Sequence, residues 1–239
     1  MDRIDETVPG GFFTLRSAPL PGGAHRPLAD LYAGDLAPLT ARVDTVAARL
    51  RTPERRVAAS IAHLGLAARL WSVALGPAAL SGRLPDLSPG RLLWDPAHSA
   101  PDDLRLPDTP TTWSTGTPEA TAERIREVVQ FGHLVPLADA LRAEVAISPR
   151  LLWGNAGSAL AGAVRELVGW ARVHGRPDAA SRARSLAAEL FGHPDLCSTG
   201  APHGPAFRRR SCCLYYRCPG GGLCGDCVLE HLPEGSGRR

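Results

Sequence analysis

The chain has 239 residues, of which 44% are hydrophobic and 21% are charged. This supplies enough apolar surface for a folded core and excludes a disordered chain, and the length suits one medium domain, alone or with a small appendage. The formal net charge is only +3, and no long arginine-rich stretch resembles a nucleic-acid-binding arm. We therefore expect no nucleic-acid partner.

The N-terminal third is predicted to be helical after a loop-rich start. Residues 1–30 are rich in proline and glycine, with one apolar patch at Phe12–Leu15 that suits a short strand. A helix is predicted for Pro38–Leu50. A longer one is predicted for Pro53–Leu75, because Thr52 is a good N-cap and proline is favoured at the first helical position. The glycine and proline that follow predict the end of this helix.

The longest apolar stretch, Val57–Leu75, bears on the question of a membrane span. Ser60, His63 and Arg69 interrupt it, which is typical of a buried amphipathic helix, so we expect no span. The first residues contain no apolar signal-peptide core, and we therefore expect a cytoplasmic protein. Its six cysteines should stay reduced there, where clustered cysteines more often bind metal than form disulfides.

The middle of the chain is predicted to hold the few strands of the fold. Residues 77–117 contain many prolines and turn formers, with short apolar runs at Leu92–Trp94 and Leu104–Leu106 that suit strands. Helices resume with a cap, proline and acid signature at Thr117–Glu119 and run to about Phe131. A shorter helix is predicted for Leu137–Val145.

Two further helices complete the predicted body. Apolar residues at helical spacing predict a long helix over Ser148–Val173, and Asp178–Leu190 is the last one. The fold class we expect is therefore mainly α, with a minor element of short strands. We divide the chain into a helical body, residues 1–195, and a linker with a metal-binding segment, residues 196–239.

Four cysteines near the C-terminus form the pattern C-C-x10-C-x2-C: Cys212, Cys213, Cys224 and Cys227. Thiolates are soft ligands that select iron–sulfur clusters, zinc or Cu(I). A C-x2-C turn points two sulfurs at one centre, and the Gly220–Gly222 run lets the chain fold back and bring the two pairs together. The spacing therefore predicts a metal site with four sulfur ligands.

Three chemistries compete for this site. Structural zinc sites bring their ligands in two C-x2-4-C pairs, which a vicinal pair fits poorly. Disulfides are disfavoured by the inferred reducing compartment. A 2Fe–2S cluster is favoured, although the spacing matches neither common ferredoxin pattern. Cys197 and Cys218 lie outside the pattern and are expected to be spectator thiols, and Asp226 is expected to be a solvated charge.

The cluster segment, residues 211–229, resembles the C-terminal signature of the FhuF-like ferric siderophore reductases. The resemblance extends more weakly to Leu151–Leu160, which contains a Trp-Gly-Asn triplet, and to Val135–Leu137. It implies a 2Fe–2S cluster on Cys212, Cys213, Cys224 and Cys227. It also implies an oxidoreductase that reduces a ferric siderophore by one electron to release Fe(II).

The same resemblance implies separate roles for the helical body and the cluster segment, and it implies the partners of the protein. The helical body would hold the ferric siderophore near the cluster. The sequence contains no G-x-G-x-x-G or P-loop fingerprint, so we expect a protein electron donor such as a ferredoxin or a flavin reductase instead of NAD(P)H. The candidate substrate contacts are Arg208, Arg209, Arg210, Trp153, Asn155 and Tyr215.

Each candidate contact also has an ordinary structural explanation. The three arginines could form a solvated linker, the tryptophan could belong to the core, and the asparagine could make a local hydrogen bond. Two other functions stay open as well. One is an iron–sulfur or zinc protein that carries electrons or senses without reducing a chelate. The other is a module of siderophore biosynthesis, suggested by the helical body alone.

Overall fold

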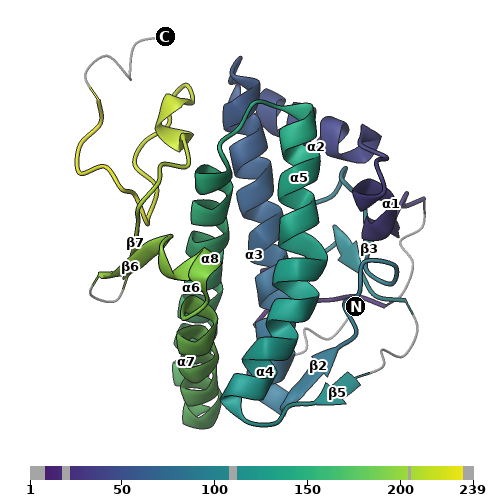
Figure 1. Cartoon of the computed structure of the whole chain (residues 1–239), viewed down its shortest axis with the longest axis vertical. Coiled ribbons are helices and arrows are strands. Elements are labelled where there is room, and N and C mark those ends of the chain that lie inside the picture. Colours follow the sequence, from purple (N-terminus) through teal and green to yellow (C-terminus); the bar gives the residue numbers. More distant parts are fainter. Residues whose placement is uncertain (1–8, 18–21, 108–111, 204–205, 234–239) are drawn as a thin grey trace.

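The computed structural model describes residues 9–17, 22–107, 112–203 and 206–233. Two long helices, α3 (Arg55–Ser81) and α6 (Pro149–Val173), pack against each other at the centre of the body. Helix α2 (Ala37–Leu50) lies against α3, and α7 (Pro177–Phe191) lies against α6 (Figure 1). The mainly α fold expected from the sequence is confirmed.

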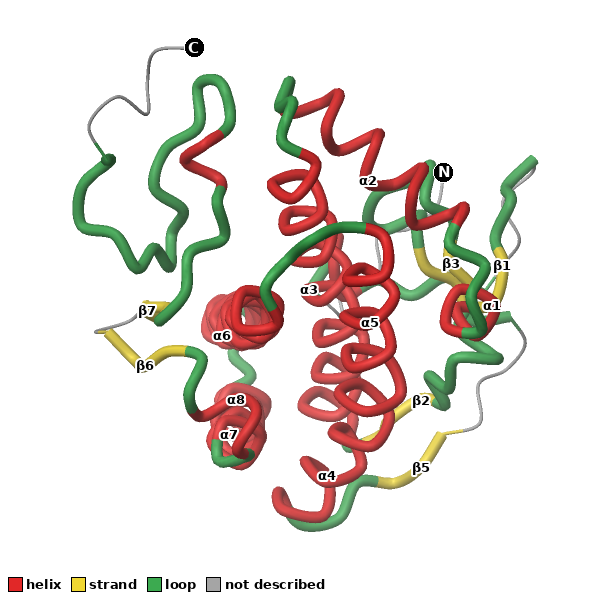
Figure 2. The backbone as a smooth tube through the Cα atoms, turned by 45° about the horizontal axis from the view of Figure 1, so that its top comes forward, coloured by secondary structure: helices red, strands yellow, loops and turns green. Residues whose placement is uncertain are grey.

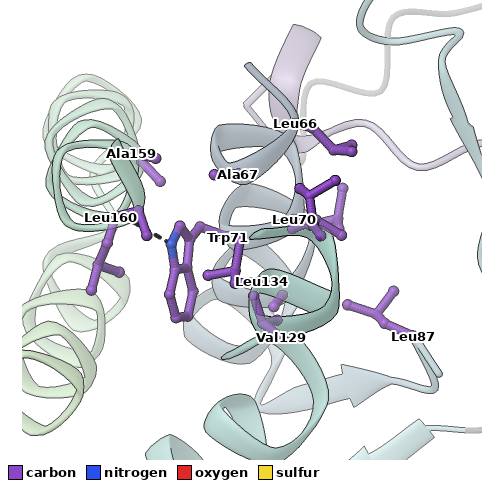
Figure 3. Close-up of a cluster of buried hydrophobic side chains, with 14 of the residues drawn as sticks. Leu66, Ala67, Leu70, Trp71, Leu87, Val129, Leu134, Ala159 and Leu160 are labelled. Carbon is purple, nitrogen blue, oxygen red and sulfur yellow. Dashed lines mark hydrogen bonds between the residues drawn. The ribbon is translucent and has the colours of Figure 1, made fainter. Parts of the chain in front are cut away.

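The core is built from small and aliphatic side chains around one tryptophan. Trp71 of α3 is fully buried, and its Nε1 donates a hydrogen bond to the carbonyl of Ala156 on α6 at 3.1 Å. Figure 3 shows Leu70 beside it on α3, with Val129 and Leu134 approaching from the neighbouring helix. The indole hydrogen bond thus joins the two central helices inside the core.

Helix α3 does not end where the sequence predicts. It continues through Gly76 and Pro77 to Ser81 and stops at Gly82, which adopts the left-handed conformation (φ 65°). Gly76 is enclosed, because a Cβ there would lie 3.0 Å from Phe13 Cδ1. The helical turn at Gly76 and Pro77 packs against the N-terminal segment, and this packing outweighs the low helix propensity of the two residues. The predicted end at Leu75 is therefore wrong.

By length and composition, α3 could cross a membrane. However, 78% of its most apolar window is buried inside the fold. This is the pattern that the core helix of a water-soluble protein shows, and it agrees with the expectation of a buried helix instead of a span.

A continuous helical segment, residues 118–144, runs beside the central helices α3 and α6. It consists of α4 (Pro118–Ile125), a π-helical stretch (Arg126–Leu134) and α5 (Val135–Glu144). The start at Thr117 is confirmed, because its side chain accepts a hydrogen bond from Ala120 N. The predicted break near Phe131 is wrong. Pro136 lies in the first turn of α5, directly after the π-helical stretch, where a missing backbone N–H is tolerated.

The strands are short. Those between residues 26 and 114 lie on one side of the helical body, and the two C-terminal strands lie on the other side, beside α6 and α7 (Figures 1 and 2). The expected strands at 92–94 and 104–106 are confirmed, whereas the patch at 12–15 contains a 3-10 turn (Gly11–Phe13) instead. A short helix, α1, covers Leu28–Tyr32. One antiparallel sheet contains β1 (Arg26–Pro27), β3 (Leu93–Trp94) and β4 (Leu104–Arg105), and a second contains β2 (Arg83–Pro85) and β5 (Thr112–Ser114).

The segment predicted to be a linker is structured. Helix α8 (Pro194–Cys197) is followed by an antiparallel hairpin of β6 (Gly200–His203) and β7 (Ala206–Arg209), which contacts α6. The cluster segment comes next and is mostly loop (Figure 2). The hairpin therefore ties the cluster segment to the body.

Candidate metal centre

The cluster segment lies beside the N-terminal halves of α3 and α6 (Figure 1). Two of the four sulfurs of the C-C-x10-C-x2-C pattern accept a hydrogen bond from the backbone N–H two residues further along the chain: Leu214 N donates to Cys212 at 3.3 Å and Leu229 N donates to Cys227 at 3.4 Å. The backbone N–H groups of Tyr215 and Asp226 act in the same direction on Cys213 and Cys224, because each favours the thiolate and lowers the pKa. Such donors stabilise negative sulfur and tune the potential of a cluster.

The pKa values of three of these thiols depend on one another. The thiols of Cys212 and Cys224 donate hydrogen bonds to the thiolate of Cys213, which holds its pKa well below the usual value. The same contacts raise the pKa of Cys212 and of Cys224. The charge of Cys227 adds to the increase at both. The thiols of Cys212, Cys213 and Cys224 therefore interact with one another, and Cys227 acts on two of them through its charge.

The other two cysteines are in different surroundings. Cys218 is buried, which raises the pKa of its thiol, and it opens the loop that joins the two ligand pairs. Cys197 is exposed, and its Sγ donates a hydrogen bond to the carbonyl of Pro194 at 3.4 Å. Neither belongs to the C-C-x10-C-x2-C pattern.

The glycine run does reverse the chain, as the sequence predicts. Gly221 N donates to the Cys218 carbonyl at 2.8 Å, with Pro219 and Gly220 (φ 71°) between them, which is a type II turn. A Cβ on Gly221 would lie 2.3 Å from the carbonyl oxygen of Tyr215. Glycine is therefore required here to close the loop.

Leu214 adopts the left-handed conformation (φ 68°) directly after the vicinal cysteine pair. This conformation costs a leucine about 1 kcal/mol. It accompanies the turn in which the N–H groups of Leu214 and Tyr215 reach the first two sulfurs. The strain is thus located where the backbone surrounds the candidate site.

A buried chain of hydrogen bonds connects the cluster segment to both central helices. Ser60 Oγ on α3 donates to the carbonyl of Cys213 at 2.8 Å. Asn155 Nδ2 on α6 donates to the Ser60 carbonyl at 2.8 Å, and Asn155 Oδ1 accepts from Arg209 Nη2 at 2.6 Å. All of these side chains are buried, so the contacts position the loop rigidly against the body.

Arg209 carries a buried charge without a matching anion. Its side chain is 1% exposed, and neither Nε nor Nη1 has a hydrogen-bond partner among the described residues. No ion pair with a carboxylate forms in the part of the chain that the structure describes. Its charge also lowers the pKa of the Cys213 thiol. An unpaired buried cation is costly, and an anionic cluster on the four sulfurs would compensate it.

Asp226, expected to be solvated, is instead buried in the C-x2-C turn. Its carboxylate accepts a hydrogen bond from Ser158 Oγ at 2.5 Å and faces Arg165 Nη1 at 3.4 Å. Its carbonyl accepts from Arg209 N at 3.0 Å. These side-chain partners lie 68 and 61 residues away in the sequence, so no local pattern could have indicated them.

Two glycines of α6 allow the hairpin and cluster segment to approach the helix closely. A Cβ on Gly154 would lie 1.9 Å from Ser211 Oγ, and one on Gly157 would lie 2.1 Å from Thr199 Oγ1 and 2.8 Å from Thr199 Cβ. The Trp-Gly-Asn triplet therefore provides a contact surface for the cluster segment. Its glycine makes room and its asparagine makes the hydrogen bonds.

The predicted substrate contacts separate into buried and exposed groups. Asn155 and Arg209 are buried, so they support the cluster segment and are not exposed to a substrate. Trp153 is half-buried against the core, and Tyr215 is half-buried in the cluster loop. The remaining two are at the surface: Arg208, which pairs with Glu230 at 2.9 Å, and Arg210.

No three His, Cys, Asp or Glu side chains of the described residues are arranged to hold a single metal ion. Tetrahedral zinc requires its ligands to converge on one point. A 2Fe–2S cluster divides its four sulfur ligands between two irons, so its ligands are spread more widely. The donor set of four thiolates, with backbone N–H groups and a buried cation, fits the latter group.

The fold and the site define a mainly helical protein with a candidate metal centre, ligated by cysteines, near its C-terminus. A family model described as ferric iron reductase FhuF-like transporter matches residues 83–206, just over half of the chain. A second one, described as FhuF 2Fe-2S C-terminal domain, matches residues 209–229 and includes all four candidate ligands. The chain belongs to the FhuF-like ferric iron reductase family and carries its 2Fe–2S domain. No curated protein matches the chain.

Proposed function

We propose that this protein transfers one electron to the Fe(III) of a ferric siderophore and releases Fe(II). The 2Fe–2S cluster is held by Cys212, Cys213, Cys224 and Cys227. The observation that carries the proposal is the four-cysteine pattern, with backbone N–H donors to Cys212 and Cys227, beside the uncompensated charge of Arg209. Membership of a ferric iron reductase family supports the reaction class.

The chemistry follows from the charge of the iron. Fe(III) is held tightly by the hard oxygen ligands of a siderophore, and one added electron gives Fe(II), for which the same ligands have far lower affinity. When bound, the cluster supplies that single electron and is oxidised by one electron. No proton has to be moved by a side chain, so the reaction needs no general acid or base.

The protein's own residues hold the site and set its electrostatics. Backbone N–H groups favour negative charge on the sulfurs, and Arg209 adds a positive charge behind them. Ser60 and Asn155 hold the loop to the helices. Residues 1–195 form the body that holds the chelate near the site, and residues 196–239 carry the hairpin and the cluster segment.

The proposal includes a cellular location and an electron donor for the protein. We place the protein in the cytoplasm, which agrees with the burial of α3 in the fold. An electron donor such as a ferredoxin or a flavin reductase supplies the electron, because the sequence has no fingerprint for a nicotinamide cofactor.

The ligand assignment is tested with two matched substitutions. Cys224→Ser should abolish the visible charge-transfer absorption and the bound iron of the purified protein, because serine cannot replace the thiolate. Cys197→Ser should leave both unchanged, because this thiol is exposed and lies outside the C-C-x10-C-x2-C pattern. Retention of the cluster in Cys224→Ser, or its loss in Cys197→Ser, would overturn the assignment.

The reaction is tested on the reduced protein without oxygen. Mixing it with a ferric siderophore should reoxidise the cluster and release Fe(II), trapped by a ferrous-specific chelator. Reoxidation without Fe(II) would favour an electron carrier or sensor. A colourless protein with stoichiometric zinc would reject the redox function.

A further inference from the structure

A pocket of about 820 Å³ lies between α6, α7 and the β6–β7 hairpin. Its walls are mostly apolar and include Val164 and Val168 of α6, Phe191 at the end of α7 and Phe207 of the hairpin. The volume falls in the range of sites that bind small molecules. It therefore suits a compact ligand with a hydrocarbon surface.

The polar lining of this pocket is almost entirely cationic. Arg165, Arg184 and Arg210 line it, and no Asp or Glu is among its described lining residues. Arg165 forms an ion pair with Asp226 at 3.4 Å. For Arg184 and Arg210, the described part of the chain provides no carboxylate ion pair. The pocket thus offers two uncompensated positive charges to a ligand.

The pocket adjoins the candidate metal centre through two of these arginines. Arg210 is two residues before Cys212, and it follows directly after the strand that carries the buried Arg209. Arg165 contacts Asp226, which lies between Cys224 and Cys227 in the C-x2-C turn. One wall of the pocket is therefore built from the residues that flank the site.

We propose that this pocket binds the ferric chelate and selects chelates of net negative charge, such as those with catecholate or carboxylate oxygens. The inference rests on the proposed reductase function. The apolar walls cover the hydrocarbon frame of the chelator, and Arg184 and Arg210 pair with its anionic oxygens. The concave shape and the volume favour a small molecule over an acidic donor protein.

Gallium(III) complexes test binding separately from electron transfer, because Ga(III) has nearly the size and the charge of Fe(III) but is not reduced. The probes are a trianionic hexadentate tris-catecholate and a neutral hexadentate tris-hydroxamate. The intact protein with its cluster should bind the trianionic complex about tenfold or more tightly than the neutral one. Equal affinity for both, or no binding of the trianionic complex, would overturn the proposal.

Two substitutions locate the binding. Arg184→Gln should weaken binding of the trianionic complex about fivefold to tenfold, with little effect on the neutral one. Arg142→Gln, which removes the same charge from an exposed site on α5, should change neither. Ala188→Trp should place a bulky ring in the pocket and weaken binding of both complexes. Unchanged binding in Arg184→Gln and Ala188→Trp would overturn the location.

Cys197 provides a second readout, because this exposed thiol also lines the pocket. The trianionic gallium complex should slow its alkylation by iodoacetamide, measured by mass spectrometry, and should not do so in Ala188→Trp. An alkylation rate that the complex leaves unchanged in the wild type would place the ligand elsewhere.

The outcomes separate this inference from the proposed function. If ferric chelates are reduced and Ala188→Trp reduces them equally well, the pocket is wrong and the reductase function stands. If the gallium complex binds in the pocket but the reduced protein releases no Fe(II), the pocket stands and the reductase function is wrong.

Discussion

Arg209 differs from both of its arginine neighbours. Its guanidinium is buried, with one hydrogen bond to Asn155, while Arg208 and Arg210 are at the surface. Alternation along β7 explains the difference, because a strand places Phe207 and Arg209 on the same, inward-facing side. A charge buried in this way is screened little by salt and acts strongly on nearby sulfur.

Substituting Arg209 should change the potential of the cluster. Arg209→Met removes the positive charge near the sulfurs, so the oxidised cluster becomes relatively more stable and the reduction potential should fall by about 50 mV or more. Spectroelectrochemical titration measures this shift. Arg210→Met removes an exposed charge and should shift the potential much less. Equal shifts in the two variants would contradict the special role of the buried guanidinium.

At the scale of elements, α6 is the helix against which the hairpin and the cluster segment pack. Gly157 allows Thr199 to approach the helix backbone, and the Thr199 carbonyl in turn accepts a hydrogen bond from Arg210 N at 2.8 Å. The helix, the hairpin and the start of the cluster segment are therefore joined at one point. A change in this contact should be transmitted to the metal centre.

A pair of glycine substitutions on α6 tests this contact. Gly157→Ala should destabilise the protein by about 1–3 kcal/mol and lower its cluster content, because the new Cβ would overlap the buried Thr199 side chain. Gly162→Ala meets no atom closer than 3.8 Å and should stabilise the helix by about 0.5–1 kcal/mol. Urea unfolding and iron content measure both effects. Stabilisation by both substitutions would show that the close approach is not required.

At the scale of the whole molecule, buried neutral histidines make the free energy of unfolding depend on pH. His133 Nε2 contacts the Leu87 carbonyl at 2.6 Å, so this nitrogen carries the proton, and Nδ1 accepts from the Tyr32 hydroxyl at 3.0 Å. Burial lowers the pKa of His133 to about 4 and contributes most to lowering that of His63 to about 3. Both are therefore neutral in the folded protein at physiological pH.

The unfolded chain binds these protons first, so stability should decrease as pH falls below about 6.5. Each buried histidine contributes about 1.4 kcal/mol per pH unit down to its folded pKa. His133→Gln should therefore reduce the slope of unfolding free energy against pH between pH 6 and 5 by about that amount. His231→Gln, at an exposed position, should leave the slope unchanged. If the wild type, His133→Gln and His231→Gln showed the same slope of unfolding free energy against pH, the neutral buried state of His133 would be contradicted.

Short-range signals in the sequence predicted much of the fold. Thr117 and the prolines at 118 and 149 mark helix starts that the structure confirms. Caps and first-turn prolines act within three or four residues, so they can be recognised without knowing the fold. The end of α3 and the continuity of the helical segment at 118–144 could not be predicted, because distant packing overrides these local stop signals.

The same distinction holds for the candidate site. The sequence by itself determined the four-cysteine pattern and its glycine turn, because ligand spacing within about fifteen residues is a local property. Only the tertiary structure decided that Arg209 and Asp226 are buried, that Ser60 and Asn155 hold the loop, and that a cationic pocket adjoins it. These contacts join segments far apart in the chain, and burial depends on what packs against a residue.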